Sequence, residues 1–142
     1  MDECVVDASV AIKLFLVEPL VDRAQALFAR LEDSPPLRMY APDLLYVECA
    51  NILWKRVRFR GYDPSLPVTD LATLQTLPIA SVPTRVLADT AIALAIRWDI
   101  SAYDACYVAL ADVRACTLVT ADERLVQRLA DSTVTVQELG TL

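Results

Sequence analysis

The sequence contains no histidine and only two glycines, Gly61 and Gly140. Without histidine there can be no Ser-His-Asp or Cys-His catalysis, no zinc–histidine site and no histidine general base. The phosphate-binding loops of P-loop NTPases and dinucleotide-binding folds need several glycines, so those classes are excluded as well. Any chemistry must therefore use carboxylates, hydroxyls, thiols or the two lysines, Lys13 and Lys55.

Long hydrophobic runs are also missing, although 56% of the residues are hydrophobic. The longest stretch without acidic or basic residues, Leu71 to Thr84, is interrupted by two prolines and is shorter than the ~20 residues of a membrane-spanning helix. We therefore expect a cytoplasmic protein without membrane contact. The length of 142 residues fits a single domain, residues 1–142, with a sizeable buried core.

The chain carries a net charge of −6, from 13 basic and 19 acidic residues. This balance disfavours a nucleic-acid partner unless metal ions offset clustered acids. The four cysteines form no Cys-x-x-Cys pair, and we expect them to be reduced and to act as small hydrophobic residues. They are Cys4, Cys49, Cys106 and Cys116.

Short apolar segments alternate with helical patterns along the whole chain. Strands are predicted at residues 3–7, 38–41, 79–82, 118–120 and 134–136, and helices at 8–16, 20–31, 43–60, 68–76, 84–99, 102–115 and 122–130. Thr84 is the expected N-cap of its helix, and Gly61 is expected to end the helix before it. Short apolar strands separated by helices predict a mostly parallel sheet covered on both faces.

Two carboxylates follow predicted strands. Asp7 ends the first strand, and Asp122 lies two residues after Thr120, which ends the fourth. Parallel sheets bind ligands beyond the carboxyl ends of their strands, so the two acids converge if these strands are neighbours. Asp122 could instead be only a helix N-cap. A functional role is harder to dismiss for Asp7, because a charge that ends an apolar first strand leaves the core at the ligand-binding edge.

Two further acids interrupt apolar helical patterns. Glu48 lies on the stripe of Leu45 and Ile52, and Asp104 lies in the first turn of a helix that is apolar on its other faces. Buried carboxylates without a partner are costly or take up a proton, so each needs a cation or a donor. Asp104 could simply complement a helix N-terminus, and Glu48 could pair with Lys55 or an arginine.

Four segments that carry these acids resemble the motifs of PIN-domain ribonucleases, particularly the VapC toxins of bacterial and archaeal toxin–antitoxin pairs. They are residues 5–13 (VVDASVAIK), 42–51 (PDLLYVECAN), 101–111 (SAYDACYVALA) and 118–122 (LVTAD). The resemblance spans nearly the whole chain, in order. It implies a three-layer α/β/α sandwich whose five-stranded parallel sheet has the order 3-2-1-4-5, which places the first strand beside the fourth.

The resemblance also implies a site. Four residues match the acidic pocket that holds Mg²⁺ or Mn²⁺ in this family: Asp7, Glu48, Asp104 and Asp122. Three match its polar surroundings: Ser9, Asn51 and Thr120. This chain departs from the pattern at Cys49 and Cys106, beside the acids, and offers Glu123 as an extra or substitute acid. A donor set made only of oxygen suits Mg²⁺ or Mn²⁺ better than zinc.

The implied function is metal-dependent hydrolysis of RNA phosphodiester bonds by the toxin of a toxin–antitoxin pair, a homodimer blocked by a cognate VapB-like antitoxin. Two alternatives remain, a PIN nuclease that is not a toxin and a PIN-like binding module without catalysis. A phosphoacceptor receiver domain is disfavoured because no lysine follows Lys55. The basic run Lys55–Arg60 is either a solvated helix end or a contact for RNA phosphates or an acidic partner.

Overall fold

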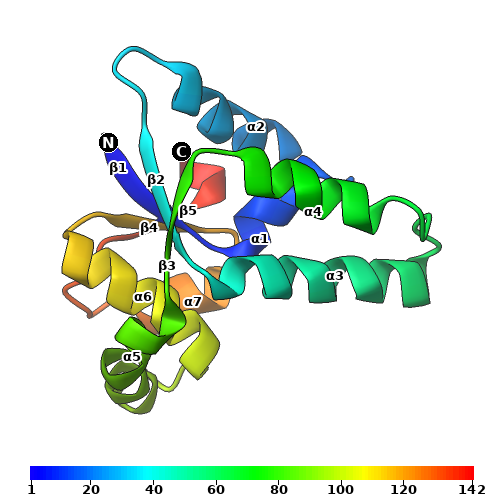
Figure 1. Ribbon diagram of the computed structural model, residues 1–142. Helices are drawn as coiled ribbons and strands as arrows, with labels where there is room; N and C mark the ends of the chain where they lie inside the picture. Colours follow the sequence, from blue (N-terminus) through cyan, green and yellow to red (C-terminus); the bar gives the residue numbers. More distant parts are fainter.

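A parallel sheet of five strands forms the middle layer of the protein (Figure 1). The computed structural model describes residues 1–142, and the strands are β1 (Glu3–Val6), β2 (Arg38–Pro42), β3 (Ile79–Val82), β4 (Thr117–Thr120) and β5 (Val136–Glu138). Their order is β3-β2-β1-β4-β5, and every neighbouring pair is parallel. The predicted fold class and strand order are therefore confirmed, including the adjacency of the first and fourth strands.

Helices cover both sides of this sheet, with α2 and α4 on one side and α5 and α6 on the other (Figure 1). The α-helices are α1 (Ala8–Ala11), α2 (Val21–Ala29), α3 (Leu44–Arg60), α4 (Pro67–Thr76), α5 (Thr84–Trp98), α6 (Ala102–Arg114) and α7 (Glu123–Arg128). Short 3₁₀ turns follow α1, α2 and β5, at Ile12–Leu14, Arg30–Glu32 and Leu139–Thr141. None of the helices is long and apolar enough to cross a membrane.

The core lies where the central strands meet helix α6. Val5 and Val6 of β1 and Leu118 and Val119 of β4 are completely buried. Every residue of α6 from 105 to 111 is buried too, and three of these seven are alanines. Small side chains let a helix pack closely against a sheet, so α6 contacts β1, β2 and β4. This packing fixes the first turn of α6, which carries Asp104.

Several predicted boundaries differ from those of the structure, and three of them illustrate how. The last strand begins at Val136 rather than Val134, because a turn in which the Ser132 hydroxyl donates to the Val134 carbonyl precedes it. Thr84 is the first residue of α5 and not its N-cap, since its N–H donates to the Asp43 side chain from the start of α3. The predicted helix at 8–16 ends as a regular α-helix at Ala11 and continues as a 3₁₀ turn.

Candidate active site

Asp7 lies at the junction between β1 and α1 and is buried, with only 6% of its surface exposed. Its Oδ1 accepts hydrogen bonds from the Ser9 hydroxyl at 2.5 Å and from the Val10 N–H at 3.2 Å, and its Oδ2 accepts one from the Thr120 hydroxyl. Burial nevertheless raises the pKa of Asp7 to about 6, because desolvation of the charged form outweighs these hydrogen bonds. The negative charge of Asp104 raises it further.

Hydroxyl groups tie the ends of β1 and β4 together around this carboxylate. The Ser9 hydroxyl oxygen accepts from the Ala121 N–H at 2.9 Å, and that of Thr120 accepts from the Asp122 N–H at 3.0 Å. Both residues also donate to Asp7. The ordinary strand pairing of β1 with β4 thus continues as side-chain hydrogen bonds that hold Asp7 and the segment before Asp122 in one arrangement.

Asp122 is the N-cap of α7. Its Oδ1 accepts from the Arg124 N–H at 2.9 Å and from the Leu125 N–H at 3.3 Å, which confirms the capping interpretation. This role uses one carboxylate oxygen. The other accepts no hydrogen bond and belongs to an exposed side chain at the carboxyl end of β4. Asp122 therefore caps the helix and still has an oxygen free for a ligand.

Glu48, on α3, is half-buried and accepts a hydrogen bond from the Tyr107 hydroxyl at 2.7 Å. Burial raises the pKa of Glu48, and the charges of Asp104 and Asp7 raise it further. It forms no ion pair, so the alternative in which it pairs with Lys55 or an arginine is wrong. Tyr107 lies in the resembling motif, but no role was predicted for it. The sequence did contain an indication of this hydrogen bond, because a tyrosine on an apolar helix is expected to be buried and a buried hydroxyl needs an acceptor.

Asp104 is in the first turn of α6, where the Ser101 side chain caps the helix by accepting from the Asp104 N–H at 3.0 Å. This position agrees with a carboxylate that complements a helix N-terminus. Burial still raises the pKa of Asp104, the Ser101 hydroxyl lowers it less, and the charge of Asp122 adds to the increase. The helix terminus therefore does not offset the cost of this charge.

The four predicted acids come from four elements and influence one another at one edge of the sheet. The charge of Asp104 raises the pKa of both Asp7 and Glu48, and that of Asp122 raises the pKa of Asp104. No lysine or arginine forms an ion pair with any of them. The protein thus gathers negative charge here and supplies no cation to balance it.

This donor set fits a hard divalent cation in its chemistry. It offers only carboxylate and hydroxyl oxygens, which Mg²⁺ and Mn²⁺ prefer. As the side chains lie here, no three acidic or thiol groups are close enough together to hold one ion. Glu48 and Asp122 each keep one carboxylate oxygen without a hydrogen bond, so each has an oxygen available to a cation. Asp7 is the one held in place.

The remaining predicted residues lie around this edge in different ways. Asn51 is exposed on α3, one turn after Glu48, and Glu123 is exposed in the first turn of α7. All four cysteines are free, and all except the half-buried Cys116 are buried. Burial, and then the charges of Glu48 and Asp7, raise the pKa of the Cys49 thiol to about 12. This thiol is therefore protonated at neutral pH and is no metal ligand or nucleophile.

The basic run at the end of α3 does not act as one unit. Arg56 pairs with Glu18, Arg58 lies 5.6 Å from the centre of the Phe59 ring, and Arg60 is in the last turn, where the helix dipole favours a cation. Lys55 instead lines a cavity beside Glu48.

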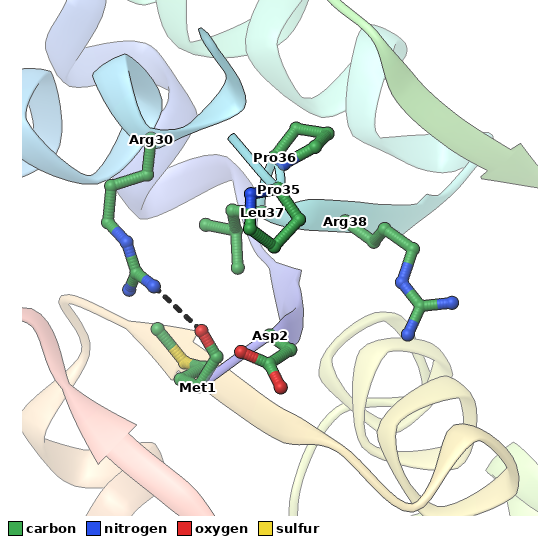
Figure 2. A pocket seen from close by; sticks show the side chains of 7 residues that line it. All are labelled: Met1, Asp2, Arg30, Pro35, Pro36, Leu37 and Arg38. Carbon is green, nitrogen blue, oxygen red and sulfur yellow. Dashed lines mark hydrogen bonds between the residues drawn. The ribbon is translucent and has the colours of Figure 1, made fainter. Parts of the chain in front are cut away.

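A different cavity, of about 290 Å³, lies at the amino-terminal edge of the sheet (Figure 2). It contains the beginning of the chain and the segment before β2, and the Arg30 guanidinium donates to the Met1 carbonyl there at 2.7 Å. Asp2 is its only acidic residue. The four acids lie beyond the carboxyl ends of the strands, so this cavity is not part of their site.

Raising the pH from about 4 to about 7 is expected to destabilise the metal-free protein. The pKa of Asp7 is about 6 in the folded state against 3.8 ordinarily, so between these values only the folded state holds the proton. The stability that this proton provides is complete below pH 4 and is lost by pH 6 to 7, which amounts to ~3 kcal/mol. Urea unfolding of the wild type and of Asp7→Asn from pH 4 to 8 in EDTA measures how the free energy of unfolding depends on this proton. A stability difference between the two proteins that does not change with pH contradicts it.

Comparison with known proteins finds relatives by sequence and by fold. The family model for the PIN domain matches residues 4–131. Ribonuclease VapC3 of Pyrobaculum aerophilum is 32% identical over 128 residues, which are 87% of this chain and 92% of that protein. VapC20 of Mycobacterium tuberculosis, a sarcin-ricin loop cleaving toxin, has a similar fold, with a TM-score of 0.68 and 18% identity over 92% of this chain and 96% of that chain. A toxin–antitoxin complex from Klebsiella pneumoniae also has a similar fold, with a TM-score of 0.65 and 17% identity over 94% of this chain and 96% of that chain.

Proposed function

The chain belongs to the PIN-domain family, and from this premise we propose that it is an endoribonuclease that hydrolyses RNA phosphodiester bonds with Mg²⁺ or Mn²⁺. The observation that carries the proposal is the group of four carboxylates at the carboxyl edge of the sheet, three of them with raised pKa values and none with a protein counter-ion. Such a site is tolerable when a cation neutralises it.

Asp7, Asp104 and Asp122 would hold the cation, and Glu48 would either join them or orient the attacking water. When bound, Mg²⁺ or Mn²⁺ supplies a Lewis acid that activates water and stabilises charge on the phosphate. Asp7 contributes a fixed oxygen pair, because three hydrogen bonds hold its carboxylate. The Tyr107 hydroxyl holds one oxygen of Glu48 through a hydrogen bond. The other oxygen would then be the one that accepts a proton from water.

The toxin role and its partners are also part of the proposal. The 32% identical relative is named a VapC ribonuclease, and the similar folds include one in a toxin–antitoxin complex. The chain exposes large apolar side chains on two helices, Trp54 and Phe59 on α3 and Ile92 and Ile96 on α5. Such exposed apolar faces are typical of protein–protein interfaces, and they support contacts with a VapB-like antitoxin and with a second copy of the chain. The proposed form is therefore a homodimer that cuts RNA in the cytoplasm.

The proposal is tested by incubating the purified protein with RNA in Mg²⁺, Mn²⁺ or EDTA. We expect cleavage with either cation and none with EDTA, and a loss of about 10²-fold or more for Asp104→Asn, because removing a ligand forfeits several kcal/mol of charge stabilisation. Activity that survives chelation, or no cleavage by the wild type under any condition, contradicts the nuclease proposal.

Expression in a bacterial host separates the toxin from its alternatives. A toxin arrests growth, and Asp104→Asn relieves the arrest. Cleavage in vitro without growth arrest indicates a PIN nuclease that is not a toxin. RNA binding without cleavage indicates a binding module.

A further inference from the structure

A cavity of about 440 Å³ opens beside the candidate active site, between α3 and the start of α6. It is lined by Val47, Glu48, Asn51, Ile52, Lys55 and Tyr103. Glu48, Asn51 and Lys55 are spaced three and four residues apart, so they follow one face of the helix. The cavity therefore begins at a candidate catalytic carboxylate and extends along α3 to a cation.

Tyr103 forms the α6 side of this cavity and precedes Asp104 in the chain. Its side chain is 67% exposed and its hydroxyl makes no hydrogen bond, unlike the buried Tyr107, whose hydroxyl binds Glu48. Val47, also 67% exposed, contributes an aliphatic surface from α3. An accessible aromatic ring is a stacking surface for a nucleobase, whatever the identity of the base.

Lys55 is the free cation of the two lysines. Lys13 is buried and pairs with Glu18 at 3.3 Å, whereas Lys55 is exposed and forms no ion pair. Along α3, Lys55 is seven residues after Glu48, which is about 10 Å on the helix axis. A phosphate bound by Lys55 is thus near the phosphate at the carboxylates without being the same one.

We propose that this cavity binds one unpaired nucleotide of a single-stranded RNA, next to the phosphate that is cut. Its base stacks on Tyr103 against Val47, its phosphate contacts Lys55, and the Asn51 amide is placed to hydrogen-bond the base edge or the ribose. A base inside a duplex is stacked and paired and cannot enter, so the cavity selects single strands. This inference rests on the proposed nuclease function and specifies its substrate.

The test measures KM and kcat for a short single-stranded RNA. Tyr103→Ala should raise KM about 5- to 100-fold with a smaller change in kcat, and Tyr103→Phe, which keeps the ring, should behave like the wild type. Lys55→Ala should raise KM and reduce the salt dependence of binding by about one phosphate contact. Arg85→Ala, which removes an exposed, unpaired cation from α5, is the matched control and should change neither.

Two results overturn the inference while leaving the nuclease function intact. One is a Tyr103→Ala variant with the KM of the wild type. The other is equal kcat/KM of the wild type for the same sequence as a single strand and as a duplex. If the wild type cleaves no RNA, the proposed function fails, and the cavity is then judged alone by fluorescence anisotropy of labelled single-stranded RNA in EDTA. Equal Kd for the wild type and Tyr103→Ala overturns it there.

Discussion

Asp7→Asn is expected to reduce RNA cleavage about 10³-fold and, at the same time, to make the metal-free protein more stable at pH 7. The activity falls because a neutral amide replaces the one carboxylate that the fold holds rigidly. The stability rises because the wild type must bury a charge at neutral pH, and the asparagine need not. Its Oδ1 can accept from Ser9 and Val10, and its Nδ2 can donate to the Thr120 oxygen. Cleavage assays with Mg²⁺ and urea unfolding in EDTA measure the two effects.

The matched control is Asp112→Asn on the exposed side of α6, which removes a carboxylate of the same charge far from the buried one. It should leave cleavage and stability nearly unchanged, because surface substitutions usually stay within about 0.5 kcal/mol. An Asp7→Asn protein that cuts RNA at the wild-type rate contradicts the catalytic role. An Asp7→Asn protein that is less stable than the wild type at pH 7 contradicts the expectation that the wild type buries a charge there.

Thr120→Val should cost about 2–4 kcal/mol at pH 7 and reduce cleavage 10- to 100-fold. The substitution keeps the shape of a completely buried side chain but removes the donor to Asp7 and the acceptor for the Asp122 N–H. Asp7 then loses a hydrogen bond that lowers its pKa, so the destabilisation should shrink near pH 4, where the carboxyl is protonated. Unfolding at both pH values, together with cleavage kinetics, measures this.

Thr117→Val supplies the comparison at the other end of β4. Its hydroxyl makes no hydrogen bond, and the same exchange there should change stability by less than about 0.5 kcal/mol. Thr120→Ser, which keeps the hydroxyl, should recover most of the activity. If Thr120→Val destabilises equally at both pH values, its effect is ordinary packing and not support of the Asp7 charge.

The layers of the fold could be predicted from the sequence because short strands and amphipathic helices each carry a local pattern. The boundaries that were wrong depend on contacts made elsewhere. The start of α5 is capped by Asp43, which lies 41 residues earlier, and no local signal near Thr84 indicates this. The pairing of β1 with β4 is equally invisible to periodicity and came only from the family resemblance.

The sequence predicted at which edge of the sheet Asp7 and Asp122 lie, but not the hydrogen-bond partners of the acids. Asp7 and Asp122 could be placed at the same edge because parallel strands end there. The hydrogen bond from Tyr107 to Glu48 could not, since it joins α6 to α3 across 59 residues. The alternative pairing of Glu48 with Lys55 was chemically reasonable, but Lys55 remains exposed in the cavity.

The hydrogen bond from Thr120 to Asp7 links residues 113 positions apart. During synthesis, therefore, a ribosome must deliver most of the chain before the Asp7 carboxylate receives this donor and before β4 can take its place beside β1. Until then, β1 has no β4 beside it, and Asp7 lacks the hydrogen bond from Thr120. A nascent chain therefore cannot bring the four carboxylates together until Asp122 has been added.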